Sequence, residues 1–127
     1  MIDHLFISVS SLPKSVKFYR KALAPIGYTA SPKFTVPSTK AKGVGFGPKG
    51  ERDFHITQGP PVVTPNHVAF RVTTRKQVNA FYKAAIAAGG RDNGKPGLTP
   101  DHGPDYYSAY VFDPDGHNIE VVCWEPN

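Results

Sequence analysis

Four residues of types that bind divalent metal ions stand at equivalent points of this 127-residue sequence: His4, His55, His67 and Glu120. Neutral imidazoles and a carboxylate suit a borderline divalent ion such as zinc, nickel, manganese, cobalt or iron. The single cysteine, Cys123, excludes an internal disulfide and a cysteine-based zinc module. A metal site in this chain must therefore be built from His, Asp and Glu.

The elements that position these residues follow from the spacing of apolar side chains. Each of the four lies in a short stretch where apolar residues alternate with others, which is typical of a strand with one apolar face. The expected apolar rows are Leu5, Ile7 and Val9; Phe54 and Ile56; Val68, Phe70 and Val72; and Ile119, Val121 and Cys123. Because the candidate ligands stand in the opposite rows, we expect all four to converge in one cleft.

An internal repeat predicts the architecture. The residues from Asp3 onward align without a gap on those from Asn66 onward at a shift of 63, which places His4 on His67. Residues 45–50 (GFGPKG) resemble residues 111–116 (VFDPDG), a Pro/Gly pattern that predicts a closing hairpin in each half. Matching His55 with Glu120 needs a shift of 65, so the two hairpins must differ by one residue.

After each first strand the spacing becomes helical. Ser10 or Ser11, with Pro13 in the first turn, predicts the start of one helix, and Thr73 or Thr74 predicts the start of the other. We therefore predict an α+β fold of two tandem βαβββ modules, 1–58 and 66–125, forming a curled mixed-sheet cleft within a single domain, 1–127. The Pro-rich segment 59–65 is expected to be an extended linker.

The charge distribution favours a small anionic ligand over nucleic acid. The formal net charge is +5, but all fifteen Lys and Arg lie at or before Lys95, and seven of the ten acids follow Arg91. No basic run is interleaved with stacking aromatic residues, as nucleic-acid binding would require. Binding to nucleic acid, the least favoured hypothesis, predicts a steep loss of affinity with salt.

The amino-terminal residues MIDHLFISVS have neither the basic region nor the apolar length of a signal peptide or membrane span. We accordingly expect a cytoplasmic protein with no membrane partner.

Several motifs resemble those of the vicinal oxygen chelate superfamily, which includes glyoxalase I, bleomycin-resistance proteins, fosfomycin-resistance transferases and extradiol dioxygenases. The resemblance rests on DHLFISVSSLPKSVKFY, on NHVAF with FYKAAIAAGG, and above all on FDPDGHNIEVV. It implies two βαβββ modules around a divalent metal, with His4, His67 and Glu120 as ligands. His55 falls where glyoxalase I has a fourth, usually acidic, ligand, so a four-ligand, a three-ligand and a metal-free site all stay open.

The resemblance also implies a function. We expect a metal-dependent enzyme of glyoxalase type, a lyase, isomerase or dioxygenase, which chelates neighbouring oxygens of a small, anionic substrate. The alternative is a non-catalytic protein of bleomycin-resistance type that sequesters a planar or basic compound between aromatic walls and binds no metal. The sequence shows no set of residues that would specifically hold the two carboxylates of glutathione.

Further residues are candidates for contact with substrate. Arg71 shares the predicted face of His67, where a guanidinium would hold a carboxylate or phosphate, or form an ion pair at a strand end. The Pro/Gly-rich segment 95–107 has the character of a covering loop. From it, His102, Tyr106 and Tyr107 would contact substrate, unless the tyrosines pack at the core edge and His102 is solvent-exposed.

Four residues have other expected roles. Glu120 is expected to act as a catalytic base as well as a ligand. His117 is expected in a turn or at the surface, and Cys123 and Trp124 in packing.

Open sheet edges favour a homodimer, in which the site lies either within one chain or between swapped halves.

Overall fold

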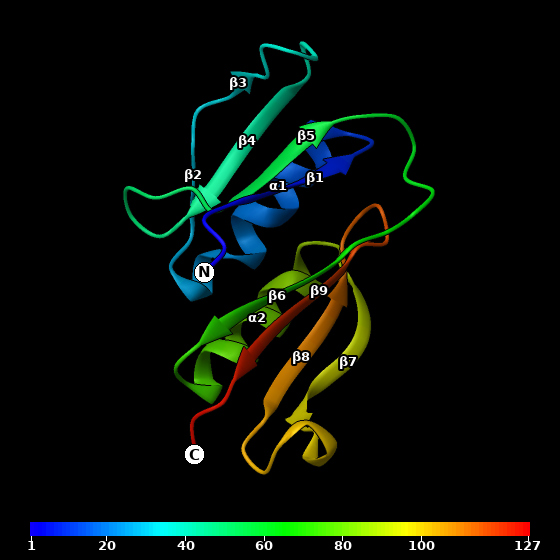
Figure 1. Ribbon diagram of the computed structural model, residues 1–127. Helices are drawn as coiled ribbons and strands as arrows, with labels where there is room; N and C mark the ends of the chain where they lie inside the picture. Colours follow the sequence, from blue (N-terminus) through cyan, green and yellow to red (C-terminus); the bar gives the residue numbers. More distant parts are fainter.

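The computed structural model describes residues 1–127, which form two units shown one above the other in Figure 1. The first unit contains β1 (Leu5–Val9), α1 (Leu12–Ala22), the 3₁₀ helix η1 (Ala24–Ile26), β2 (Thr29–Ala30), β3 (Phe34–Thr35), β4 (Lys42–Gly47) and β5 (Phe54–Gln58). The second contains β6 (His67–Val72), α2 (Arg75–Ala87), β7 (Arg91–Leu98), the 3₁₀ helix η2 (Pro100–His102), β8 (Tyr107–Phe112) and β9 (Asn118–Cys123).

Each unit has its own mixed sheet. The strand order is β1-β5-β4-β2 in the first sheet, where β3 also pairs with β4, and β6-β9-β8-β7 in the second. In each, the first strand runs parallel to the last, and the remaining pairs are antiparallel. The predicted α+β fold of two βαβββ units is confirmed. Both β1 and β6 are edge strands of their sheets.

The strand register shows that the predicted one-residue difference between the hairpins is wrong. Phe46 pairs with Phe54 and Val111 pairs with Ile119, so the two hairpins are equal in length. Phe6 pairs with His55, and Ala69, its equivalent at a shift of 63, pairs with Glu120. His55 and Glu120 therefore occupy equivalent places in the two sheets. The hairpins themselves turn at Gly50 and Gly116, whose φ values of 82° and 87° favour glycine.

The helices begin where the sequence predicts. Ser11 caps α1 by accepting a hydrogen bond from the Lys14 backbone N–H, and Thr74 caps α2 by accepting one from Gln77. The linker residues 59–65 contain no helix or strand and lead from β5 back to β6 along one side of the molecule (Figure 1).

One hydrophobic core joins the two units. The predicted apolar rows of β1, β5, β6 and β9 all contribute to a single cluster of 22 buried residues, together with apolar side chains of both helices. Phe54 of β5 meets Phe70 of β6 with ring centroids 5.2 Å apart. Because the apolar rows share this core, the opposite faces of both sheets point away from it.

A buried polar network also crosses between the units. His117, expected in a turn or at the surface, is instead 1% exposed. Its Nδ1 accepts a hydrogen bond from the Asn66 backbone N–H at 2.9 Å, and its Nε2 lies 2.8 Å from the Ser8 carbonyl oxygen. A carbonyl oxygen only accepts, so Nε2–H is the donor. The expectation was wrong because His117 fills the junction between β1 and the start of β6.

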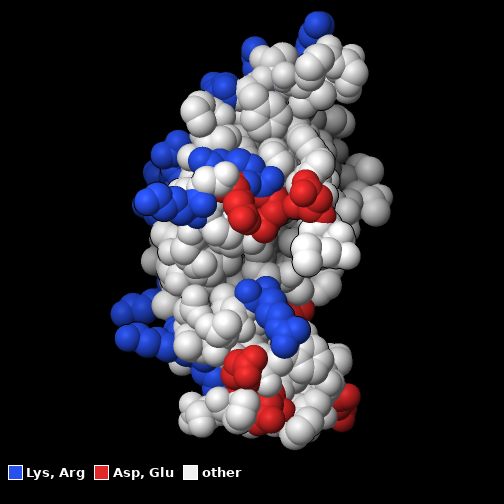
Figure 2. Space-filling view, turned by 60° about the vertical axis from the view of Figure 1, so that its left-hand side comes forward, with Lys and Arg blue, Asp and Glu red and all other residues white.

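The surface carries charges of both signs. Figure 2 shows Lys and Arg along much of one face, with Asp and Glu in separate groups among them. That face has no continuous stripe of positive charge. Neither helix has the length and apolar character needed to span a membrane.

Candidate functional site

The four candidate ligands form two pairs. His67 Nε2 lies 3.1 Å from Glu120 Oε1 in the second sheet. The rings of His4 and His55 have centroids 5.7 Å apart in the first sheet. No three His, Cys, Asp or Glu side chains of the chain lie close enough to hold one metal ion. Within one chain, the structure does not bring the four residues into a single cleft, because the two pairs lie on separate sheets.

The His67–Glu120 pair has the geometry of two ligands of one ion. His67 Nδ1 lies 3.0 Å from the Asn118 carbonyl oxygen, which only accepts, so Nδ1–H is the donor and Nε2 is the nitrogen that faces Glu120. Either a hydrogen on Nε2 or a metal cation can bridge Nε2 and the Glu120 oxygen. Atoms that each lie about 2.1 Å from one ion are separated by about 3.0 to 3.4 Å. The N–O distance of 3.1 Å fits a cation shared by His67 and Glu120.

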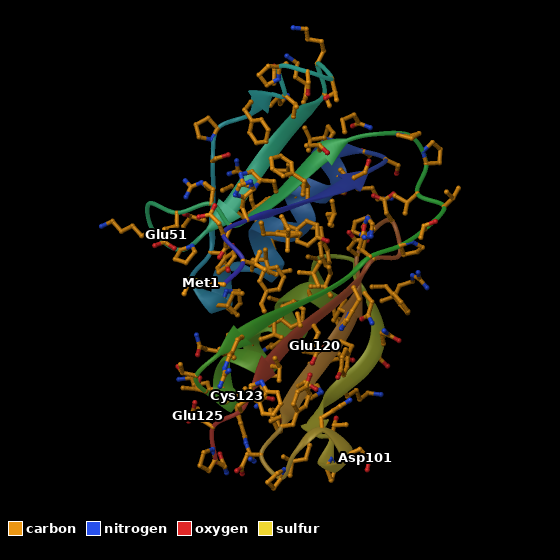
Figure 3. The ribbon with its side chains drawn as sticks, viewed as in Figure 1. Met1, Glu51, Asp101, Glu120, Cys123 and Glu125 are labelled. Atoms are coloured by element: carbon orange, nitrogen blue, oxygen red, sulfur yellow. The ribbon has the colours of Figure 1, made fainter.

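The Glu120 carboxyl group is enclosed by the protein. Its residue is 3% exposed, whereas the His67 side chain is half exposed. In Figure 3, Glu120 lies on β9 in the middle of the second sheet. The Tyr106 hydroxyl donates a hydrogen bond to Glu120 Oε2. Burial, followed by this bond, raises the pKa of Tyr106 above its ordinary value, so the hydroxyl keeps its proton.

The other pair lies among aromatic rings. Phe6 stacks on His55 with centroids 4.4 Å apart, and Phe34 meets His55 edge-on at 5.7 Å. Burial lowers the pKa of His55, and the neighbouring His4 lowers it further, so the neutral, ligating form is favoured. His4 Nδ1 lies 2.5 Å from Asp3 Oδ1, so Nε2 is the His4 nitrogen that would bind a ligand.

Glycine is required beside His55. A Cβ atom at Gly45, on β4, would lie 2.9 Å from the His55 ring, closer than side-chain carbons approach one another. The absence of a side chain at Gly45 therefore leaves the space that the imidazole occupies.

The remaining predicted contacts divide between the two faces of the second sheet. Arg71 is exposed, and its guanidinium carbon lies 5.8 Å from the Trp124 ring. The Tyr106 ring contacts both His102 and Trp124, at 4.8 and 4.7 Å. Trp124, expected in packing, is 42% exposed. These residues gather near Glu120.

Tyr107 lies elsewhere. It pairs with Cys123 of the apolar row, its hydroxyl donates to Asn79 Oδ1 at 2.7 Å, and its ring faces Arg75 of α2 at 5.0 Å. The structure therefore does not bring Tyr107 to the other candidate residues.

Sequence reasoning missed Tyr110. This residue pairs with Glu120 across β8 and β9, and its ring centroid lies 6.3 Å from that of His67. The alternation within YSAYVF would have placed Tyr110 on this face, had the start of β8 been known.

Comparison with known proteins agrees with this fold. The family model of the Glyoxalase/Bleomycin resistance protein/Dioxygenase superfamily matches residues 1–121. The chain belongs to this superfamily. A glyoxalase/bleomycin resistance protein from Albidiferax ferrireducens is 27% identical, with 98% of each chain covered and a TM-score of 0.73.

Two further solved structures show the range of the family. An E144Q mutant of glyoxalase I from Zea mays is 27% identical, with a TM-score of 0.69 over 95% of this chain and 46% of the maize chain. This chain thus spans about half of that protein. The fosfomycin resistance protein FosX from Listeria monocytogenes, solved with Mn(II) and sulfate, is 19% identical, with a TM-score of 0.69 over 97% of this chain and 91% of that one. That likeness shows the fold.

Proposed function

We propose that this protein is a metal-dependent enzyme of glyoxalase type, a lyase or isomerase, that acts on a small, oxygenated, anionic substrate. The observation that carries the proposal is the His67–Glu120 pair, in which ring Nε2 faces a buried carboxylate oxygen at 3.1 Å. A divalent cation bound at this point would neutralise the carboxylate and be held by both side chains.

Two copies of the chain would complete the site. In this proposal, His67 and Glu120 of one copy bind the ion together with His4 and His55 of a second copy. The edge strands β1 and β6 leave both pairs beside unpaired backbone, where a second chain can dock. In a two-fold dimer, β1 of one copy would lie beside β6 of the other. The symmetry repeats this contact, so the dimer would contain two equal sites.

Other residues of the chain would bind the substrate, accept its proton and cover it. The bound ion supplies a Lewis acid for neighbouring substrate oxygens. Arg71, held by its contact with Trp124, would fix a carboxylate or phosphate of the substrate bidentately. Oε1 of Glu120, which faces His67 while Oε2 holds the Tyr106 hydroxyl, would be the oxygen that accepts a proton from the carbon beside a carbonyl when it is not bound to the ion. Tyr106 and His102 would cover the substrate from the loop before β8.

Metal content of protein purified without a polyhistidine tag tests this function. Mass spectrometry should find one divalent ion per chain in the natural protein and none in Glu120→Gln or His67→Ala. Glu125→Gln, a matched change at an exposed carboxylate, should keep its ion. The natural protein should then convert 2-oxoaldehyde or diol substrates with the bound metal. A natural protein that binds no zinc, nickel, manganese, cobalt or iron would overturn the proposal.

A second candidate function is sequestration of a planar compound without chemistry. Phe6, 49% exposed, stacks on His55, and the half-exposed Trp124 stands beside Tyr106. In the dimer proposed above, the rings from the first sheet of one copy and those from the second sheet of the other would enclose a flat ligand by stacking. This function predicts that metal-free protein binds an aromatic compound tightly, and that Phe6→Ala and Trp124→Ala each weaken that binding while Glu120→Gln does not.

A further inference from the structure

We propose that Tyr106 is a positioning residue that restricts Glu120 to a single free carboxylate oxygen, and this inference rests on the proposed metal-dependent function. Glu120 has two oxygens with different surroundings. Oε1 faces His67 Nε2, and Oε2 receives the Tyr106 hydroxyl. One oxygen is thus available to a shared cation, and the other is occupied by a donor from a different element.

The loop before β8 holds Tyr106 firmly. Thr99 N–H donates to the Tyr106 carbonyl at 2.9 Å, which closes the loop at its base, and Tyr106 N–H donates to Gly103 at 3.3 Å. The Tyr106 ring is packed between His102 and Trp124, with centroids 4.8 and 4.7 Å away. A ring fixed by both backbone and neighbours gives its hydroxyl a defined direction, as a supporting group for a metal ligand requires.

The number of free carboxylate oxygens decides how a substrate can bind. A carboxylate binds a divalent ion through one oxygen or through two. Three histidines and one oxygen of Glu120 would take about four of the six positions around an octahedral ion and leave two. A substrate that chelates through two neighbouring oxygens needs both. If Oε2 also bound the ion, a single position would be left.

Tyr106→Phe removes only the hydroxyl and is therefore the decisive variant. Tyr107→Phe is its matched control, because it removes the hydroxyl of the adjacent tyrosine, which bonds Asn79 on the opposite face of the sheet. Both variants are to be loaded with cobalt(II), and oxalate is the bidentate anionic probe. We expect Tyr106→Phe to retain cobalt but to bind oxalate about tenfold more weakly, the equivalent of one hydrogen bond.

The cobalt(II) absorption spectrum supplies a readout that does not depend on turnover. The spectrum of Tyr106→Phe should change in intensity, because the coordination of Glu120 changes, and that of Tyr107→Phe should match the natural protein. Equal oxalate affinity and equal spectra in all three proteins would overturn the role of Tyr106.

Separate measurements distinguish a failure of the metal-dependent function from a failure of the positioning role of Tyr106. If the natural protein bound no cobalt, the metal-dependent function would fall. The orientation of Glu120 is then read in the metal-free protein from the ¹⁵N chemical shifts of the His67 ring. Those shifts should move in Tyr106→Phe, where Glu120 is released, and stay constant in Tyr107→Phe. No movement in Tyr106→Phe would overturn the positioning role.

Discussion

Replacing His117 by alanine should strongly destabilise the protein, because this residue satisfies backbone groups of both units. The imidazole is 1% exposed and bonds the Ser8 carbonyl and the Asn66 N–H at 2.8 and 2.9 Å. His117→Ala removes the hydrogen-bond partner of both part-buried backbone groups. Each unsatisfied group costs about 1 to 3 kcal/mol, so we expect a loss of about 3 kcal/mol.

Thermal unfolding followed by circular dichroism measures this effect. For a chain of this size, about 3 kcal/mol corresponds to a fall in Tm of about 10 °C. His102→Ala is the matched control, since His102 is exposed and makes one ring contact, and it should change stability by less than about 0.5 kcal/mol. A fall in Tm for His117→Ala no larger than that of His102→Ala would refute the reasoning.

Two further predictions concern a buried tyrosine and a constrained glycine. Burial, followed by Asp113, raises the pKa of Tyr19 well above its ordinary value. The protonated Tyr19 hydroxyl therefore contributes to the free energy of unfolding below about pH 10, and this contribution is lost as the pH rises further. In Tyr19→Phe, the free energy of unfolding measured in urea should fall less steeply above about pH 10. An equally steep fall in both proteins would contradict this. Gly94 has φ 153°, and a Cβ there would lie 2.7 Å from the Tyr110 ring. Gly94→Ala should therefore lower the free energy of unfolding by about 1 to 2 kcal/mol, and an unchanged Tm would argue against that contact.

Local patterns predicted the elements of this fold. The alternation in LFISV and HVAFRV predicted which residues of β1 and β6 are buried, and the Ser and Thr caps predicted where the helices begin. The repeat predicted that His55 and Glu120 are equivalent, and the strand pairing confirms it. These features depend on neighbours along the chain or on one hairpin, so the sequence carries them directly.

Features that depend on contacts between distant segments could not be predicted. His117 follows a DPDG turn, which usually lies at the surface, and its burial depends on Ser8, 109 residues away. Tyr106 and Tyr107 lie on opposite faces of the second sheet, and which face each takes depends on where β8 begins. A shift of one residue would move every side chain of the strand to the other face. The two units pack around a common core, and this packing separates the two His-containing pairs. No periodic pattern in the sequence indicates how the units pack.

Mixing two defective variants tests the shared metal site most directly. His4→Ala and Glu120→Gln should each bind no ion alone. In a heterodimer of the two, one site carries both changes and the other carries neither. Random mixing after unfolding and refolding should therefore restore about a quarter of the natural metal content, since half of the dimers are mixed and half of their sites are intact. No recovery in the mixture would contradict a site shared between two copies.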